Sequence, residues 1–321
     1  MKATHLGHYI LGGMGWDKDS TGGYTVNVYR SFTVKELAVI TSQLADVAFY
    51  ESGISLCKLT HSCFMDLVKS IENAGHKYLS PKYNYSELAR DIREDFFKSL
   101  MNALSMFKSL RDHADVSLLK RFGKGSVQHK AWLNHQSSIY DRSFSYRLFH
   151  NLRNYCQHVG LPNLIIDLEG VPRVAPGYDT VKVDLMLSPE SLLASYENWS
   201  AQAKKDLARC AGNIKLGQYI NEWGHDICDL INFYVETLRQ DVYESAVSIL
   251  SMRAIYGIGP TGPLGLFELE GGVIEQGQHA IQAIPEEICN LIYTGHDIYI
   301  EDSVFSGGLS VDGVVIICRD G

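Results

Sequence analysis

Apolar positions recur every three or four residues through much of the chain, which is the spacing of one packed face of an α-helix. This pattern predicts helices over about 34–47, 60–73, 84–111, 115–122, 126–140, 144–159, 190–212, 215–252 and 285–292. Shorter β-rich stretches predict strands at 4–12, 23–31, 162–169 and 180–187, and further strand-like pieces at 272–277, 296–302 and 313–320. We therefore expect a mainly α-helical bundle with a short β-insert and small β-containing N- and C-terminal segments.

The predicted elements fall into three parts along the chain. Residues 1–80 hold the expected hairpin and the first helices, 81–256 hold the helical domain with its β-insert at 162–187, and 257–321 form a small α/β segment. A loop rich in Gly and Pro begins at Gly257 and marks the last boundary. Its glycines match neither a P-loop nor a dinucleotide-binding fingerprint, and no cofactor is expected.

The helix expected at 144–159 carries two neighbouring stripes of side chains. The apolar stripe consists of Leu148, Leu152, Tyr155 and Val159. The polar stripe beside it consists of Arg147, Asn151, Asn154 and His158. Gly160 and Pro162 are expected to end the helix, because Gly tolerates the left-handed cap and Pro cannot extend the hydrogen-bond ladder. We expect the apolar stripe to pack and the polar stripe to be presented for binding.

Charge is distributed unevenly along the chain. The whole chain has a net charge of −8, whereas residues 118–158 contain seven Lys or Arg and one acid, a balance of +6 that leaves −14 for the rest. A basic segment on an acidic protein fits local phosphate binding with limited non-specific affinity for nucleic acid. The alternative interpretation of the same segment is an ordinary solvated helix face.

The cysteines and the hydropathy pattern favour a cytoplasmic protein. The seven cysteines include no CxxC pair and read as reduced thiols. Cys57 and Cys63 lack the second ligand pair that a zinc site needs, and we expect no metal. We find no N-terminal signal segment and no apolar run of roughly 18 residues, and we expect no membrane association.

One short motif adds chemistry to the basic segment. Residues 153–158, Arg-Asn-Tyr-Cys-Gln-His, contain the one Arg-x4-His spacing in the chain, at the end of an amphipathic helix. At this point the sequence resembles the HEPN superfamily, whose ribonuclease members carry an RxxxxH motif, often RNxxxH, on a helical bundle. The segment LRNYCQHVGLP also resembles bacterial HEPN-like proteins in which the motif is followed by GLP and a short β segment. The resemblance covers about residues 85–255.

The resemblance implies a metal-independent endoribonuclease. In such a site the RNA 2′-hydroxyl attacks the adjacent phosphate and leaves a 2′,3′-cyclic phosphate. His158 would transfer protons, Arg153 would stabilise the charge on phosphorus, and Asn154 would orient the imidazole or bind phosphate. Further RNA or phosphate contacts are expected from Arg142, Arg147, Lys130 and Asn151. By family analogy the protein would form a homodimer and act in toxin–antitoxin systems or phage defence, where an antitoxin or other inhibitory partner could restrain it.

Helix geometry leaves alternatives open. On an ideal helix Arg153 points more than a quarter turn away from the stripe of Asn154 and His158. Either the helix is irregular here, or Arg153 reaches around it, or Arg153 serves the site of a second protomer. A second hypothesis is a non-catalytic HEPN-like module that binds RNA, a nucleotide or a protein partner. A third is a metal-dependent hydrolase, for which no clustered ligands are found. The motif residues could also form a polar cluster that caps the helix.

Overall fold

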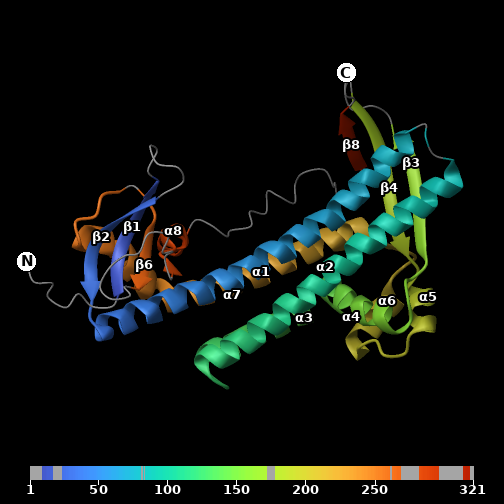
Figure 1. The fold of residues 1–321 in the computed structure, drawn as a ribbon. Coiled ribbons are helices and arrows are strands. Elements are labelled where there is room, and N and C mark those ends of the chain that lie inside the picture. The colour runs from blue at the N-terminus through green and yellow to red at the C-terminus, as the bar shows by residue number, and fades with distance from the viewer. Residues whose placement is uncertain are drawn as a thin grey trace, which may run out of the picture. The chain divides into compact units, whose positions relative to one another are not determined.

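The protein is mainly helical with small antiparallel sheets, as the sequence predicts. The computed structural model describes residues 9–16, 24–80, 82, 84–171, 178–260, 262–268, 282–295 and 314–318 (Figure 1). No helix within these ranges is long and apolar enough to cross a membrane. The chain divides into a first unit, Met1–Ile54 with Val235–Tyr299, and a second unit, Ser55–Tyr234 with Ile300–Gly321. Each unit is described by itself.

A small sheet in the first unit joins the N-terminal hairpin to two strands that follow α7 in the sequence. Strand β1 lies between β2 and β6, and β6 also pairs with β7, all antiparallel (Figure 1). The bounds are Tyr9–Trp16 (β1), Tyr24–Phe32 (β2), Leu264–Glu268 (β6) and Gln282–Ala283 (β7), with helix α8 at Glu286–Thr294. The expected N-terminal hairpin and the expected helix at 285–292 are thus confirmed, and residues 4–8 lie outside the described residues.

The grouping of the chain differs from the three consecutive parts expected from the sequence. The segments 1–80 and 257–321 are not separate, because β6 satisfies the free edge of β1 and an unpaired edge exposes backbone donors and acceptors. Strand β8 (Val314–Cys318) instead pairs with β4 (Tyr178–Leu187) in the second unit. The strand-like pieces at 272–277 and 296–302 lie outside the described residues.

Three of the expected helix boundaries are also corrected. The helices expected at 34–47 and 60–73 form one helix, α1 (Val34–Leu79), because Tyr50, Ile54 and Cys57 continue the buried stripe between them. The stretch 84–122 is likewise one helix, α2 (Tyr85–Phe122). The helix expected at 190–212 is two, α5 (Pro189–Ser195) and α6 (Ala201–Arg209). Ser200 starts α6, since its hydroxyl accepts a hydrogen bond from the Ala203 N–H.

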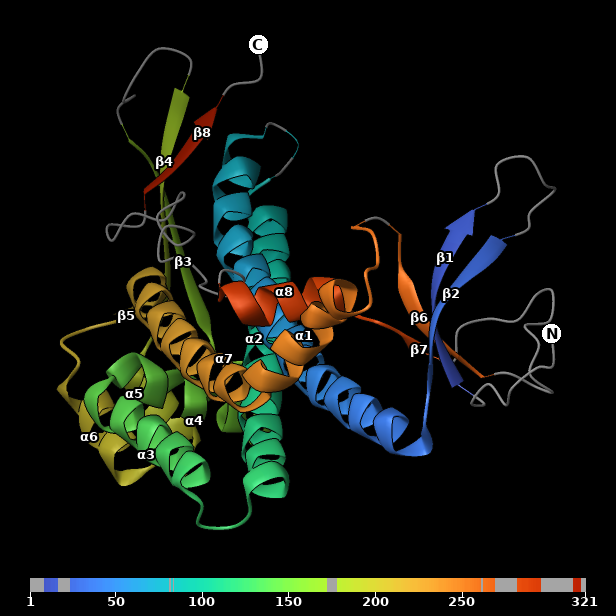
Figure 2. The same ribbon diagram turned by 90° about the vertical axis from the view of Figure 1, so that its left-hand side faces the viewer.

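Helices α2, α3 (Val127–Arg142) and α4 (Phe144–His158) pack against one another in the second unit. Their starts are capped by Asn84, Ser126 and Ser143, whose side chains each accept a hydrogen bond from the N–H three residues later. Helix α4 also contacts α6, and Figure 2 shows α3, α4, α5 and α6 gathered into one cluster. The predicted helices at 126–140 and 144–159 are confirmed.

The β-insert is an antiparallel pair that follows α4 directly. Strand β3 (Leu164–Val171) pairs with β4 from Leu164–Leu187 to Val171–Thr180. The other edge of β4 pairs with β5 (Ile214–Lys215) and with β8. Helix α7 (Leu216–Ile255) begins immediately after β5. The predicted strands at 162–169 and 180–187 are confirmed within two residues.

Aromatic packing fixes α4 in the second unit. Trp223 is fully buried, and its ring lies 4.5 Å from that of Phe149 and 5.5 Å from that of Phe107, which belongs to α2. The predicted apolar stripe of α4 is buried at Leu148, Leu152 and Tyr155, but Val159 is 45% exposed because it follows the last helical residue. One face of α4 is thus held rigidly, and its remaining surface positions the motif.

Candidate functional site

The three motif residues lie at the C-terminal end of α4. Arg153 and Asn154 are half-buried, whereas His158, the last residue of the helix, is exposed. Arg153 donates a hydrogen bond of 3.0 Å from Nη1 to the Gln157 side chain, and its buried Nε meets no acceptor among the described residues. The His158 ring stacks on that of Tyr196 at 6.5 Å and 8°. None of these contacts pairs Arg153 or His158 with a carboxylate.

Arg153 and His158 point in different directions from the helix. Five residues of regular α-helix correspond to a rotation of about 140°. Arg153 falls on the face of α4 that also carries Tyr146, His150 and Gln157, whereas His158 falls beside Asn154. This agrees with the direction expected from the sequence. Within one chain the motif therefore does not form a compact pair of an imidazole and a guanidinium.

Arg147 and Asn151 are structural, which corrects their expected role as RNA contacts. Arg147 is 5% exposed, and its Nε lies 2.7 Å from the Asp206 carboxylate of α6. Its Nη1 also donates to the backbone carbonyls of Tyr140 and Asp141, the last turn of α3. The Asn151 amide, which is 4% exposed, bonds the Arg147 carbonyl and the Ser200 N–H. Both side chains are used to join α4 to α3 and α6.

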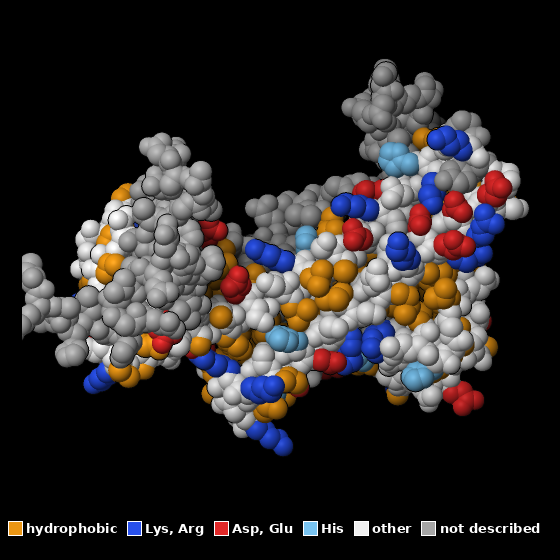
Figure 3. All heavy atoms as spheres, in the orientation of Figure 1, with side chains coloured by type: hydrophobic (Ala, Val, Ile, Leu, Met, Phe, Trp, Pro, Cys, Tyr) orange, Lys and Arg blue, Asp and Glu red, His pale blue; other side chains and the backbone are white. Residues whose placement is uncertain are grey.

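Three further residues of the basic segment contact acids from elsewhere in the second unit. The exposed Arg142 pairs with Asp229 of α7, which also accepts a hydrogen bond of 3.1 Å from His135. His129 pairs in the same way with Asp115 of α2 at 2.9 Å. On the face drawn in Figure 3, Lys and Arg side chains are scattered, many of them beside Asp and Glu, and form no continuous basic patch. Among the four expected RNA contacts, Lys130 is exposed and has no ion pair with a described carboxylate.

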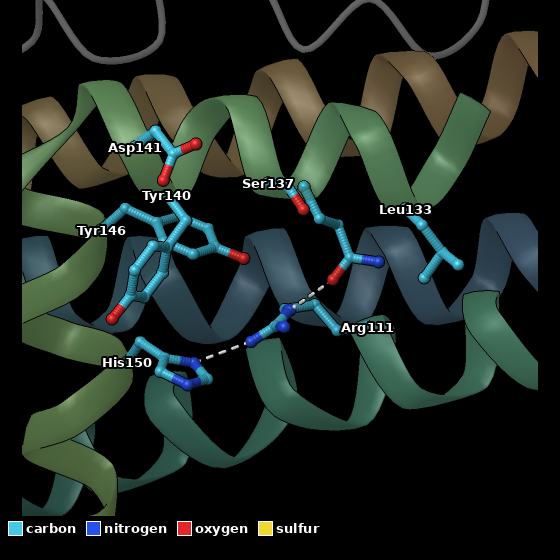
Figure 4. Close-up of a pocket in the computed structure, with 8 residues that line it drawn as sticks. Arg111, Leu133, Ser137, Tyr140, Asp141, Tyr146 and His150 are labelled. Carbon is cyan, nitrogen blue, oxygen red and sulfur yellow. Dashed lines mark hydrogen bonds between the residues drawn. The ribbon is translucent and has the colours of Figure 1, made fainter. Parts of the chain in front are cut away.

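A pocket beside the motif was not predicted from the sequence. It has a volume of about 570 Å³ and lies between α2, α3 and α4. Its lining residues are Arg111, Leu133, Gln136, Ser137, Tyr140, Asp141, Tyr146 and His150. Figure 4 shows Arg111 and His150 meeting on one side of it. His150 and Tyr146 share the face of α4 that carries Arg153, a spacing visible in the sequence, but Arg111 comes from a separate helix with no motif to connect it.

The contact between Arg111 and His150 fixes the protonation of the imidazole. Nη1 of Arg111 lies 2.7 Å from Nδ1 of His150. A guanidinium only donates, so Nδ1 accepts and the ring proton resides on Nε2. Burial, followed by the positive charges of Arg111, Lys108 and Arg153, lowers the pKa of His150 to about 4. His150 is therefore a neutral hydrogen-bond donor at neutral pH, with its Nδ1 occupied.

The hydroxyl of Tyr146 is an unusual feature of the same pocket. Tyr146 is 1% exposed, and its hydroxyl is buried without a hydrogen-bond partner among the described residues. Burial raises the pKa of this hydroxyl to about 12, so it carries its proton. The guanidinium of Arg111 lies 5.7 Å from the centre of the Tyr146 ring. A buried hydroxyl without a partner costs free energy, which a bound ligand could recover.

Metal chemistry and known relatives give no further guide. No three His, Cys, Asp or Glu side chains in the described part of the chain lie together as metal ligands would. Comparison of the chain with protein-family models, with curated proteins and with solved structures returned no match.

Proposed function

We propose that the protein is a metal-independent endoribonuclease of the HEPN type, acting through Arg153, Asn154 and His158. The observation that supports this most is that neither Arg153 nor His158 has an ion pair with a described carboxylate, whereas Arg142 and Arg147 both do. A guanidinium and an imidazole left unpaired near one helix end are the groups that RNA transesterification requires.

The proposed reaction needs one proton acceptor, one proton donor and one cation. The 2′-hydroxyl oxygen attacks phosphorus as its proton passes to a base, the bond from phosphorus to the 5′-oxygen breaks, and that oxygen receives a proton. The products are a 2′,3′-cyclic phosphate and a free 5′-hydroxyl. The His158 imidazole would move the protons, and the Arg153 guanidinium would stabilise the charge that develops on the phosphoryl oxygens.

The divergence of Arg153 and His158 leads us to propose a site shared by two copies of the chain. In a two-fold dimer the end of one α4 would face the end of the other, and Arg153 of one protomer could approach His158 of its partner. Asn154 and the exposed Lys130 would then contact the RNA backbone. This arrangement explains how side chains about 140° apart on one helix could act on a single phosphate.

We further propose the cytoplasm as the site of action, with RNA as substrate and a role in toxin–antitoxin systems or phage defence under an inhibitory partner. A second candidate is a non-catalytic RNA- or nucleotide-binding module. It is favoured by the intramolecular contacts of the motif, in which Arg153 bonds Gln157 and His158 stacks on Tyr196 without meeting Arg153.

Incubation of the full chain with total RNA in excess EDTA tests the proposal. Wild type and His113→Ala, a variant of an exposed histidine on α2, are expected to cleave RNA, whereas His158→Ala is expected to be inactive. All three should give the same helical circular dichroism. RNA binding without cleavage by the wild type would favour the binding module, and cleavage by His158→Ala would remove His158 from the site.

A further inference from the structure

The pocket between α2, α3 and α4 contains a guanidinium whose charge is not matched by the protein. Arg111 is half-buried, and its Nε donates to Oε1 of Gln136 at 2.8 Å while its Nη1 donates to His150. Both acceptors are neutral, and no described carboxylate forms an ion pair with Arg111. Desolvating a cation without a counter-ion is unfavourable, so this arrangement suits an anion that arrives from outside.

The neighbours of Arg111 present hydrogen-bond donors to the same space. Because Oε1 of Gln136 accepts from Arg111, the amide nitrogen of Gln136 is left to donate. Ser137 adds a hydroxyl to the lining. Figure 4 shows the ring of Tyr146 extending from α4 toward the side of the pocket where Ser137 and Arg111 lie, with its unpartnered hydroxyl leading. These donors match an anion with several acceptor oxygens.

The remaining walls indicate that the pocket can hold a molecule larger than the anion alone. The pocket, at about 570 Å³, falls within the range of about 300–1,000 Å³ for small-molecule sites and exceeds what a lone phosphate needs. Leu133 and the Tyr140 ring supply apolar surface, and the Tyr140 hydroxyl is occupied by Ser200 at 2.6 Å. Asp141 is a lining carboxylate that can accept hydrogen bonds from sugar hydroxyls.

We propose that this pocket binds a nucleoside monophosphate group, with the phosphate against Arg111 and Gln136 and the sugar toward Asp141. The group can come from a free mononucleotide or from the phosphorylated end of an RNA chain. The pocket is separate from His158, because Tyr146 and His150 lie on a different face of α4, the face that also carries Arg153. Tyr146 would donate its hydroxyl proton to a phosphate oxygen.

Isothermal titration of the full chain tests the proposal with five probes: AMP, adenosine, inorganic phosphate, and one oligonucleotide in its 5′-phosphorylated and its 5′-hydroxyl form. AMP is expected to bind more tightly than adenosine or inorganic phosphate. Arg111→Gln should weaken AMP binding about tenfold or more, and Tyr146→Phe, which removes only the hydroxyl, should weaken it by about threefold to tenfold. Arg90→Gln, an exposed arginine on the same helix, is the matched control and should bind like wild type.

The outcomes separate the sources and the two proposals. Preference for the phosphorylated oligonucleotide over its hydroxyl form identifies an RNA end, whereas binding of AMP without that preference identifies a free nucleotide. His158→Ala, which is expected to lose RNA cleavage, should bind AMP like wild type. The cleavage proposal and the pocket proposal can therefore fail separately. Absence of saturable AMP binding at millimolar concentration would overturn the proposal. Unchanged AMP binding by both Arg111→Gln and Tyr146→Phe would overturn it as well.

Discussion

Nη1 of Arg111 on α2 lies 2.7 Å from Nδ1 of His150 on α4, and this contact couples two helices through a charged donor and a neutral imidazole. Protonation of Nδ1 would place two cationic donors against each other. The contact therefore persists only while His150 is neutral. It gives the helical unit a pH dependence that can be measured without knowing the ligand.

The first prediction is that His150 destabilises the fold on acidification. Its pKa is lowered to about 4 by burial and by Arg111, Lys108 and Arg153, with Asp112 opposing, while the unfolded chain keeps the usual 6.5. Between these pH values the unfolded state binds a proton at His150 and the folded state does not. The free energy of unfolding is therefore highest above pH 6.5 and falls as the pH drops toward 4. The loss of unfolding free energy that is due to His150 should amount to about 1–3 kcal/mol.

Urea unfolding at pH 7 and pH 5 measures this effect. The free energy of unfolding of wild type should fall more between the two pH values than that of His150→Gln, which has no ionisable group at the site. His113→Gln, at an exposed position of α2, is the control and should follow the wild type. Equal losses for wild type and His150→Gln would contradict the contact as described.

The second prediction concerns the ion pair of Arg147 and Asp206. Their side chains are 6% and 13% exposed, so Arg147→Ala leaves a largely buried carboxylate without its cation, with the Gln202 amide still donating to it, and should lower the free energy of unfolding by about 3–5 kcal/mol. Arg142→Ala, which breaks the exposed pair with Asp229, should cost less than about 1 kcal/mol. Urea denaturation of both variants checks the difference, and similar costs for the two would refute the structural role of Arg147.

The outcome for Arg147 illustrates what the sequence could and could not predict. Helical periodicity predicted α4, and Gly160 and Pro162 predicted its end, because spacing and helix-stop residues are local properties. The same periodicity placed Arg147 and Asn151 on a polar stripe but could not reveal that Asp206 and Ser200 of a distant segment cover it. A polar side chain at helical spacing is compatible with solvent and with a buried partner alike.

The pocket also depends on a contact between helices that the sequence pattern does not reveal. Tyr146 and His150 are one turn apart and were visible as neighbours, but Arg111 reaches them from α2, 39 residues earlier than His150. Helix boundaries failed for a related reason: Asp115 reads locally as a helix start, yet it lies within α2 and pairs with His129 across the packing interface. Tertiary contacts decided each of these cases.

The third prediction is that Cys156, although inside the motif, takes no part in cleavage. Burial raises the pKa of its thiol to about 11, so the reactive thiolate is scarce at neutral pH. Cys156→Ser should retain RNA cleavage within about threefold of wild type, because the change keeps the size of the side chain nearly constant. Loss of cleavage in a variant with unchanged circular dichroism would show that the thiol is needed.

The central claim is that RNA is cut at a site formed by Arg153 of one protomer and His158 of its partner. Mixing Arg153→Ala with His158→Ala tests it most directly, since each mixed dimer keeps one intact shared site. After random exchange, cleavage in EDTA should return to roughly a quarter of the wild-type rate, while each variant alone stays inactive. A mixture that remains inactive, although both variants fold and exchange subunits, would contradict the shared site.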